Sequence, residues 1–192
     1  GEWFLDEKAN KLYFIPPAGT RCPDLENRIT VSVFQTAASV NDYVTIENLH
    51  IEGYSGRAIS IGHEKQYGKI DGCTIKNSYV GIAGTSNNFI EITNNTIQDI
   101  FNTGISFWTV SNTTVSGNTV ENIGLYPGVG GQFIGIIMAS TKPKESVKNV
   151  VSYNQVRNIG YSGIMYRLGD GTPKNAAIIE KNIVDHALMT LA

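Results

Sequence analysis

Short alternations of apolar and polar residues recur along most of the chain. Residues 88–107 hold three of them, which begin near Ile90, Ile97 and Ile105 and are separated by bends rich in Asn and Gly. A period of two over such short runs, bounded by residues that favour turns, predicts short β-strands joined by tight bends. The pattern therefore indicates an all-β fold.

These three short strands belong to a unit that repeats. The segment Ile92–Ile97 has counterparts along the chain, and successive first residues are 24, 22, 23, 36 and 28 residues apart. These first residues are Ile46, Ile70, Ile92, Val115, Val151 and Ile179. A second column follows the first five, and it reads Ala58-Ile59, Gly81-Ile82, Gly104-Ile105, Gly135-Ile136 and Gly163-Ile164. Two columns in register predict a solenoid whose coils, about 4.8 Å apart, share backbone hydrogen bonds and one interior.

The bend inside each repeat carries asparagine in four consecutive units. Because stacking places like residues above one another, we expect these side chains inside the solenoid, bonded to one another and to the turn backbone. The two earlier units hold Leu49 and Cys73 at this position, so the ladder is predicted to begin in the third unit. The four asparagines are Asn95, Asn118, Asn154 and Asn182.

The composition limits the class of protein. A chain of 192 residues fits one domain, and 41% hydrophobic with 17% charged residues is typical of an ordered protein. The formal net charge of −2 gives no nucleic-acid footprint, and no apolar run approaches the length of a membrane span. No initiator Met or signal peptide is recognisable, so we expect a mature or trimmed product. Cys22 and Cys73 lie in unlike contexts, and we expect Cys73 to be a small buried residue.

Two regions follow from this pattern. Residues 1–43 precede the repeats and read as a hairpin followed by an alternating strand at Ile29–Phe34. That strand is expected to cover the open end of the first coil, because the terminal rung of a solenoid exposes unpaired backbone. Residues 44–192 form the solenoid, whose last unit stops before a full coil closes, and we expect a C-terminally truncated fragment.

The Asn column, the Gly-Ile column and the step of about two dozen residues resemble the right-handed parallel β-helix of the pectate-lyase-like superfamily. The resemblance covers Val44 to the C-terminus, and residues 1–17 are similar to a segment that precedes the repeats in many β-helical carbohydrate-active proteins. It implies an all-β single-chain solenoid of about five to six coils with an N-terminal hairpin and strand cap.

The same resemblance implies a function class. Proteins of this kind are mostly secreted bacterial glycoside hydrolases and polysaccharide lyases. We therefore expect a polysaccharide or oligosaccharide partner, an extracellular, cell-surface or periplasmic location, and a monomer. Part of a glycoside hydrolase is the preferred interpretation, with a lyase and a non-catalytic binding, adhesin or structural segment as alternatives.

The third strand of each coil predicts a shallow trough on the outside of the solenoid, where the usual substrate groove of the superfamily runs. Alternation places one residue of each such strand outward: Ser60, Ala83, Ser106, Ile137 and Met165. The following column reads Gly62, Thr85, Trp108, Ala139 and Arg167. We expect Trp108 and Arg167 to project two rungs apart, and Trp108 with Tyr126 to stack on a sugar ring.

Three insertions border this trough. Residues 124–133 come before the strand that contains Ile136, residues 140–147 come after it, and residues 169–174 follow the next trough strand. Loops held by a rigid scaffold are where function concentrates. These segments therefore supply most of the candidate site residues.

A glycoside hydrolase needs two carboxyl groups about 5–9 Å apart across the scissile bond. The acids on the trough side are Glu64, Glu145 and Asp170. Glu145 and Asp170 follow the trough strands of neighbouring coils, so we expect them to approach one another. His63, beside Glu64, is the candidate acid–base histidine.

A polysaccharide lyase needs a base for the proton beside a uronic carboxylate and positive charge for the enolate. Lys142 or Lys144 with Arg167 is similar to the Lys–Arg arrangement of β-helical alginate and chondroitin lyases. The His expected after the Arg is Leu168 here, and no acidic calcium cluster is evident. No metal-ligand spacing or cofactor motif indicates a bound group, so any calcium requirement stays open.

Overall fold

The computed structural model describes residues 2–6, 8–9, 11–15, 19, 32–125, 133–140 and 146–188. The chain divides into two compact units, Gly1–Val31 and Ser32–Ala192. In the first unit, β1 (Glu2–Asp6) and β2 (Lys11–Ile15) pair as an antiparallel hairpin. The Asp6 carboxylate accepts hydrogen bonds from the backbone N–H groups of Lys8 and Ala9, which stabilises the turn.

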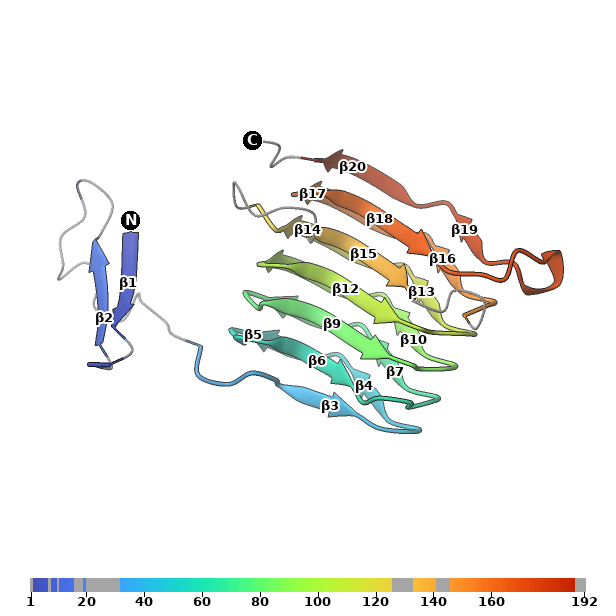
Figure 1. Cartoon of the computed structure of the whole chain (residues 1–192), viewed down its shortest axis with the longest axis horizontal. Helices are drawn as coiled ribbons and strands as arrows, with labels where there is room; N and C mark the ends of the chain where they lie inside the picture. The colour runs from blue at the N-terminus through green and yellow to red at the C-terminus, as the bar shows by residue number, and fades with distance from the viewer. Residues whose placement is uncertain are drawn as a thin grey trace. The chain divides into compact units, whose positions relative to one another are not determined.

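The second unit is a stack of parallel coils, each made of three short strands (Figure 1). One sheet contains β4 (Thr45–Glu47), β7 (Lys69–Asp71), β10 (Glu91–Thr93), β13 (Thr114–Ser116), β16 (Val150–Ser152) and β19 (Ile178–Glu180). A second contains β5 (His50–Glu52), β8 (Thr74–Lys76), β11 (Thr96–Ile100), β14 (Thr119–Ile123), β17 (Gln155–Ile159) and β20 (Ile183–Ala187). The third contains β3 (Ala38–Val40), β6 (Arg57–Ile61), β9 (Val80–Thr85), β12 (Thr103–Trp108), β15 (Ile134–Ala139) and β18 (Ser162–Arg167). Six strands in each sheet confirm the predicted all-β solenoid of about five to six coils.

The start of the solenoid differs from the expectation. Ser32–Phe34, the described part of the predicted strand Ile29–Phe34, form no strand. The carbonyl of Phe34 accepts the backbone N–H of Ser55 at 3.0 Å, so the chain here follows a bend of the first coil rather than a strand. The third sheet begins instead at Ala38, where β3 pairs with β6.

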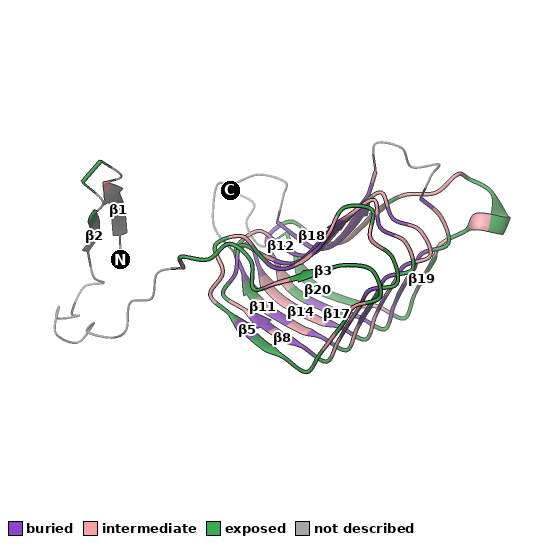
Figure 2. Cartoon of the chain, turned by 90° about the horizontal axis from the view of Figure 1, so that it is seen from below, coloured by how far each residue is buried: buried purple, intermediate pink, exposed green. Residues whose placement is uncertain are grey.

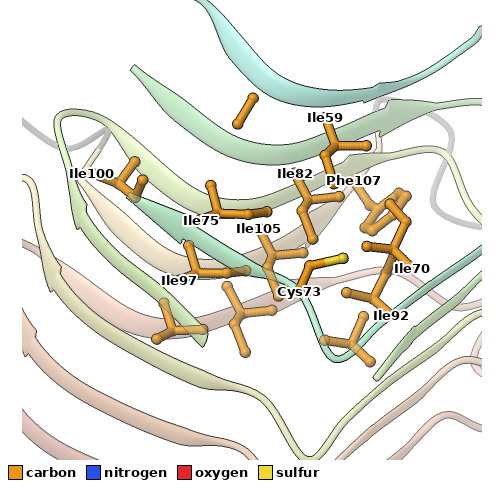
Figure 3. Packing of buried hydrophobic residues seen from close by; sticks show 14 of the residues in the cluster. Ile59, Ile70, Cys73, Ile75, Ile82, Ile92, Ile97, Ile100, Ile105 and Phe107 are labelled. Atoms are coloured by element: carbon orange, nitrogen blue, oxygen red, sulfur yellow. The ribbon is translucent and has the colours of Figure 1, made fainter. Parts of the chain in front are cut away.

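The interior is filled by columns of β-branched residues. Ile70 lies in register with Ile92, and Ile75 with Ile97, and all four side chains are fully buried (Figure 3). Burial of each such side chain contributes about 1.5–3 kcal/mol. In Figure 2 buried residues alternate with partly exposed ones along most strands of the first two sheets, which is the period of two that the sequence carries.

The predicted asparagine ladder is confirmed. The side-chain oxygen of Asn118 accepts hydrogen bonds from the backbone N–H and the side-chain amide of Asn95, both at 3.0 Å. Asn118 in turn donates to the Asn154 side chain and to the carbonyl of Ile92. The pattern continues from Asn154 to the partly exposed Asn182. Each amide therefore satisfies buried polar groups of its own coil and of its neighbours.

The ladder begins in the third unit, as predicted. The backbone N–H of Cys73 donates to the Asn95 side chain at 2.9 Å, so the lowest amide is still used. Cys73 is buried and has a free thiol, which confirms its interpretation as a small interior residue. Leu49 occupies the same column in the first coil, where it is 48% exposed.

Glycine is required in the Gly-Ile column because neighbouring strands approach closely there. A Cβ placed on Gly104 would lie 2.6 Å from the carbonyl oxygen of Gly135 and 2.6 Å from the Val120 side chain. Gly135 meets Gly163 and Val156 in the same way. Only a residue without a Cβ keeps the third sheet this close to the second.

We predict that Asn118→Ala strongly destabilises the solenoid. The substitution leaves the buried backbone N–H of Asn95 without an acceptor, and one such orphaned group costs about 1–3 kcal/mol. The free energy of unfolding in urea measures this loss. Asn182→Ala, in the same column but partly exposed in the last coil, is the matched control and should cost less, because water can replace its partners. Equal losses at the two positions would contradict a buried ladder.

Candidate functional site

The outer face of β12, β15 and β18 forms the expected trough. Ser106 pairs in register with Ile137 and then with Met165 along the floor. At the ends of the same strands, Trp108 pairs with Ala139 and then with Arg167. The strand register confirms both predicted columns over these three coils.

A hollow of about 360 Å³ lies over these three strands. Its lining divides into a floor, a side at the strand ends and a side at the strand starts. The floor contains Ser106, Ile134, Ile137 and Met165; the Trp108 side contains Trp108 and Arg167; the Tyr161 side contains Asn102, Thr103 and Tyr161. We call this hollow the trough.

The Trp108 side holds the two residues that the sequence singled out. Trp108 is 44% exposed, and Arg167 is also exposed. They are separated by two rungs, or about 10 Å, and the residue between them is Ala139, which is small and buried. Arg167 has no ion-pair partner among the described residues, so its guanidinium donors are available to a ligand.

The floor of the trough contains large apolar side chains as well as small residues. Ile134 and Ile137 are 4% and 8% exposed, and with Ala139 they form a cluster against which Met165 packs. This cluster is separate from the interior of the solenoid. All six residues of β15 are buried, so its outward residue Ile137 lines the trough with only a small exposed area.

The Tyr161 side was not recognised in the sequence. The side-chain amide of Asn102 donates to the Tyr79 hydroxyl at 3.3 Å, and the Thr103 hydroxyl donates to the Asn102 oxygen at 2.7 Å. These bonds orient polar groups at the edge of the trough, opposite Trp108. Their only signal in the sequence is position, because each lies one or two residues before a glycine of the Gly-Ile column.

A model of the right-handed β-helix region matches residues 32–187 of the chain. The chain belongs to the right-handed β-helix family. No curated protein and no solved structure matches it. The family match extends from β3 to β20 and includes every strand of the trough, so it confirms the predicted fold of the part that carries the site. A fold of this kind hosts many chemistries, and the function must be argued from the trough itself.

Asp170, a predicted catalytic acid, lies in a turn of the β-helix beyond the end of β18 and does not line the trough. Its carboxylate accepts hydrogen bonds from the side chain of Asn175 at 2.7 Å and from the backbone N–H and hydroxyl of Thr172 at 2.9 and 2.8 Å. The bond from Asn175, followed by those from Thr172, lowers the pKa of Asp170, because all three favour the charged form. This environment suits a structural turn better than a proton donor.

His63 and Glu64 follow β6, at the edge of the β-helix two coils before Trp108. The backbone N–H of Glu64 donates to the carbonyl of Thr85, and Thr85 pairs with Trp108. Both side chains are exposed, 3.8 Å apart between the His63 Nδ1 and a Glu64 carboxylate oxygen, and neither lines the trough.

The remaining predicted site residues lie outside the described residues: Tyr126, Lys142, Lys144 and Glu145. The structure thus brings together Trp108 and Arg167, and leaves His63, Glu64 and Asp170 apart from them. Within the described part of the chain, no group of three or more His, Cys, Asp and Glu side chains could hold a metal ion. No helix in that part has the length and apolar character to cross a membrane.

We predict that the Asp170 carboxyl titrates below about 3.9, the ordinary value for Asp, in an NMR titration of the intact protein. A lowered pKa in the folded state means that its contribution to stability is complete above the ordinary value and is lost as the pH falls through the lowered one. Removing both side-chain donors, in the variant Thr172→Ala with Asn175→Ala, should move the pKa toward the ordinary value, although the backbone N–H of residue 172 still donates. A pKa above the ordinary value would instead support the general-acid role.

Proposed function

We propose that this right-handed β-helix protein binds a polysaccharide or oligosaccharide along the trough. The observation that carries the proposal is the placement of Trp108 and Arg167 on one side of a hollow that extends over three coils. An indole offers a broad apolar surface to the C–H face of a sugar ring, while its edge stays wet. A guanidinium presents five donors to hydroxyl or carboxylate oxygens.

The opposite side of the trough supports the same proposal. Asn102, Thr103 and Tyr161 place amide and hydroxyl groups within one hollow with Trp108. A few polar groups around an apolar surface are typical of sites for small molecules and short polymers. Because the hollow crosses β12, β15 and β18, it fits a stretch of glycan better than a single compact ligand. A polymeric glycan would meet the protein outside the cytoplasm, at the cell surface or in the periplasm.

For the reaction, we propose glycoside hydrolysis first. It follows from the family resemblance of the repeats and the N-terminal segment, and it needs a pair of carboxyl groups. None of the trough-lining residues that the structure describes is a carboxylate. The hydrolase proposal therefore depends on a pair of acids outside that lining, and Glu145, which follows β15 in the sequence, is the first candidate for one of them.

Elimination by a lyase is the second candidate, and Arg167 favours it. This side chain lines the trough, where it can stabilise the negative charge that develops beside a uronic carboxylate. The base would come from Lys142 or Lys144, in the same segment as Glu145. If neither reaction occurs, the trough acts in binding alone.

We predict that Trp108→Ala and Arg167→Ala each weaken glycan binding about tenfold, because the first removes a stacking surface and the second a charged donor. Affinity electrophoresis on a panel of neutral and uronic polysaccharides measures this effect. Thr85→Ala is the matched control, since Thr85 pairs with Trp108 in the preceding coil but does not line the trough. Unchanged retention of both variants on every glycan would refute the binding proposal.

The reaction is tested by following new reducing ends and the ultraviolet absorbance of unsaturated products on the same panel. Reducing ends without absorbance indicate hydrolysis, and Glu145→Gln should then reduce the rate at least 100-fold, the lower end of general acid–base catalysis. Both signals together indicate elimination, and Lys142→Ala, Lys144→Ala and Arg167→Ala should reduce the rate instead. Binding with neither signal would contradict both reactions.

A further inference from the structure

The floor of the trough changes character along the solenoid axis. In the coils of β6, β9 and β12 the outward central residue is small: Ser60, Ala83 and Ser106. In β15 and β18 it is Ile137 and then Met165. The trough is therefore polar at Ser106 and apolar one and two rungs further on.

The apolar part of the floor does not belong to the interior of the solenoid. Ile136 and Met138 belong to the main core, whereas Ile137 belongs to a separate cluster against which Met165 packs. Met165 is only partly buried and lines the hollow, so it is accessible to a ligand. An apolar lining with a few polar side chains around it is typical of a ligand-binding pocket.

The patch lies where a substituent of a bound sugar would fall. Trp108 and Arg167 project from the ends of β12 and β18, whereas Ala139 between them is small. Ile137 precedes Ala139 by two residues and therefore lies on the same face of β15. A substituent that extends from a ring stacked on Trp108 into the trough, one or two rungs along the solenoid axis and toward the strand starts, therefore meets Ile137 and Met165.

We propose that the trough selects a sugar residue that carries a methyl group, either as a 6-deoxy sugar or as an acetyl substituent, and that Ile137 and Met165 contact this methyl. The inference rests on the proposed glycan binding. A hydroxyl placed over Ile137 and Met165 would give up its bonds to water, and these two side chains offer no hydrogen-bond donor in exchange. A methyl group gains contact with the same surface and loses nothing.

Matched glycans test the proposal. One pair consists of oligosaccharides that end in L-fucose or in L-galactose, which differ by a single hydroxyl. The other pair consists of an acetylated xylan and its deacetylated form. We expect the protein to bind the methyl-bearing member of one pair at least fivefold more tightly, measured by calorimetry or affinity electrophoresis. The pair that responds distinguishes a deoxy sugar from an acetyl group.

Variants of the floor test the contact itself. Met165→Gln keeps the length of the side chain and adds an amide, so it should remove the preference while binding of the hydroxyl-bearing member is kept. Ala83→Ser, one coil before Ser106 and outside the trough lining, should leave the preference unchanged. Because Met165 is partly exposed, the fold should tolerate its replacement, and a melting curve checks this.

Three outcomes count against the proposal. Equal binding of both members in both pairs, with loss of binding in Trp108→Ala, overturns the methyl preference and leaves glycan binding intact. A preference that survives in folded Met165→Gln also overturns it. Failure to bind any glycan of the panel overturns the proposed function and the methyl preference with it.

Discussion

The buried asparagine ladder is the constraint on which the rest of this molecule depends. A bend that turns the chain inside a solenoid buries backbone N–H and C=O groups that no strand can pair. Asn118 satisfies the N–H of Asn95 and the carbonyl of Ile92 with one side chain, and the same geometry recurs in each following coil. Because each amide bonds across a coil boundary, the ladder also holds neighbouring coils in a single register. If one coil slipped along its strand direction relative to the next, several of these hydrogen bonds would break at once.

That register places the trough. Trp108 and Arg167 are 59 positions apart in the sequence, yet the pairing of β12 with β15 and of β15 with β18 brings them to one side of a single hollow. The scaffold makes this placement insensitive to insertions, because a longer loop between coils leaves the strand register unchanged. The step of 36 residues between the repeats at Val115 and Val151 is accommodated in this way.

The repeating columns could be predicted from the sequence, because like residues recur at nearly constant spacing. Trp108 and Arg167 were placed by the same counting. Counting columns could not predict features that occur in only one coil. Asn149 forms a second internal amide contact, accepting the N–H of Thr113 and donating to the Val110 carbonyl, but no other coil has Asn at this position. Asp170 was interpreted by its proximity to the trough, whereas Thr172 and Asn175, two and five residues later, engage its carboxylate in a local turn. The segment that contains Lys142, Lys144 and Glu145 interrupts the repeat, so counting columns cannot place it.

The division between inward and outward columns also determines where specificity can change. An inward residue such as Ile136 is fully buried against neighbouring coils, so a change of volume there disturbs the stack. Outward residues are not constrained by the packing of the interior. Ser106, Ile137 and Met165 occupy one outward column in three successive coils, and the strand pairing is the same in all three. Ile137 is already buried in a cluster with Ile134 and Ala139, whereas Met165 is only partly buried. The proposed methyl preference would therefore depend mainly on Met165, where a change of side chain leaves the strand register and the interior intact.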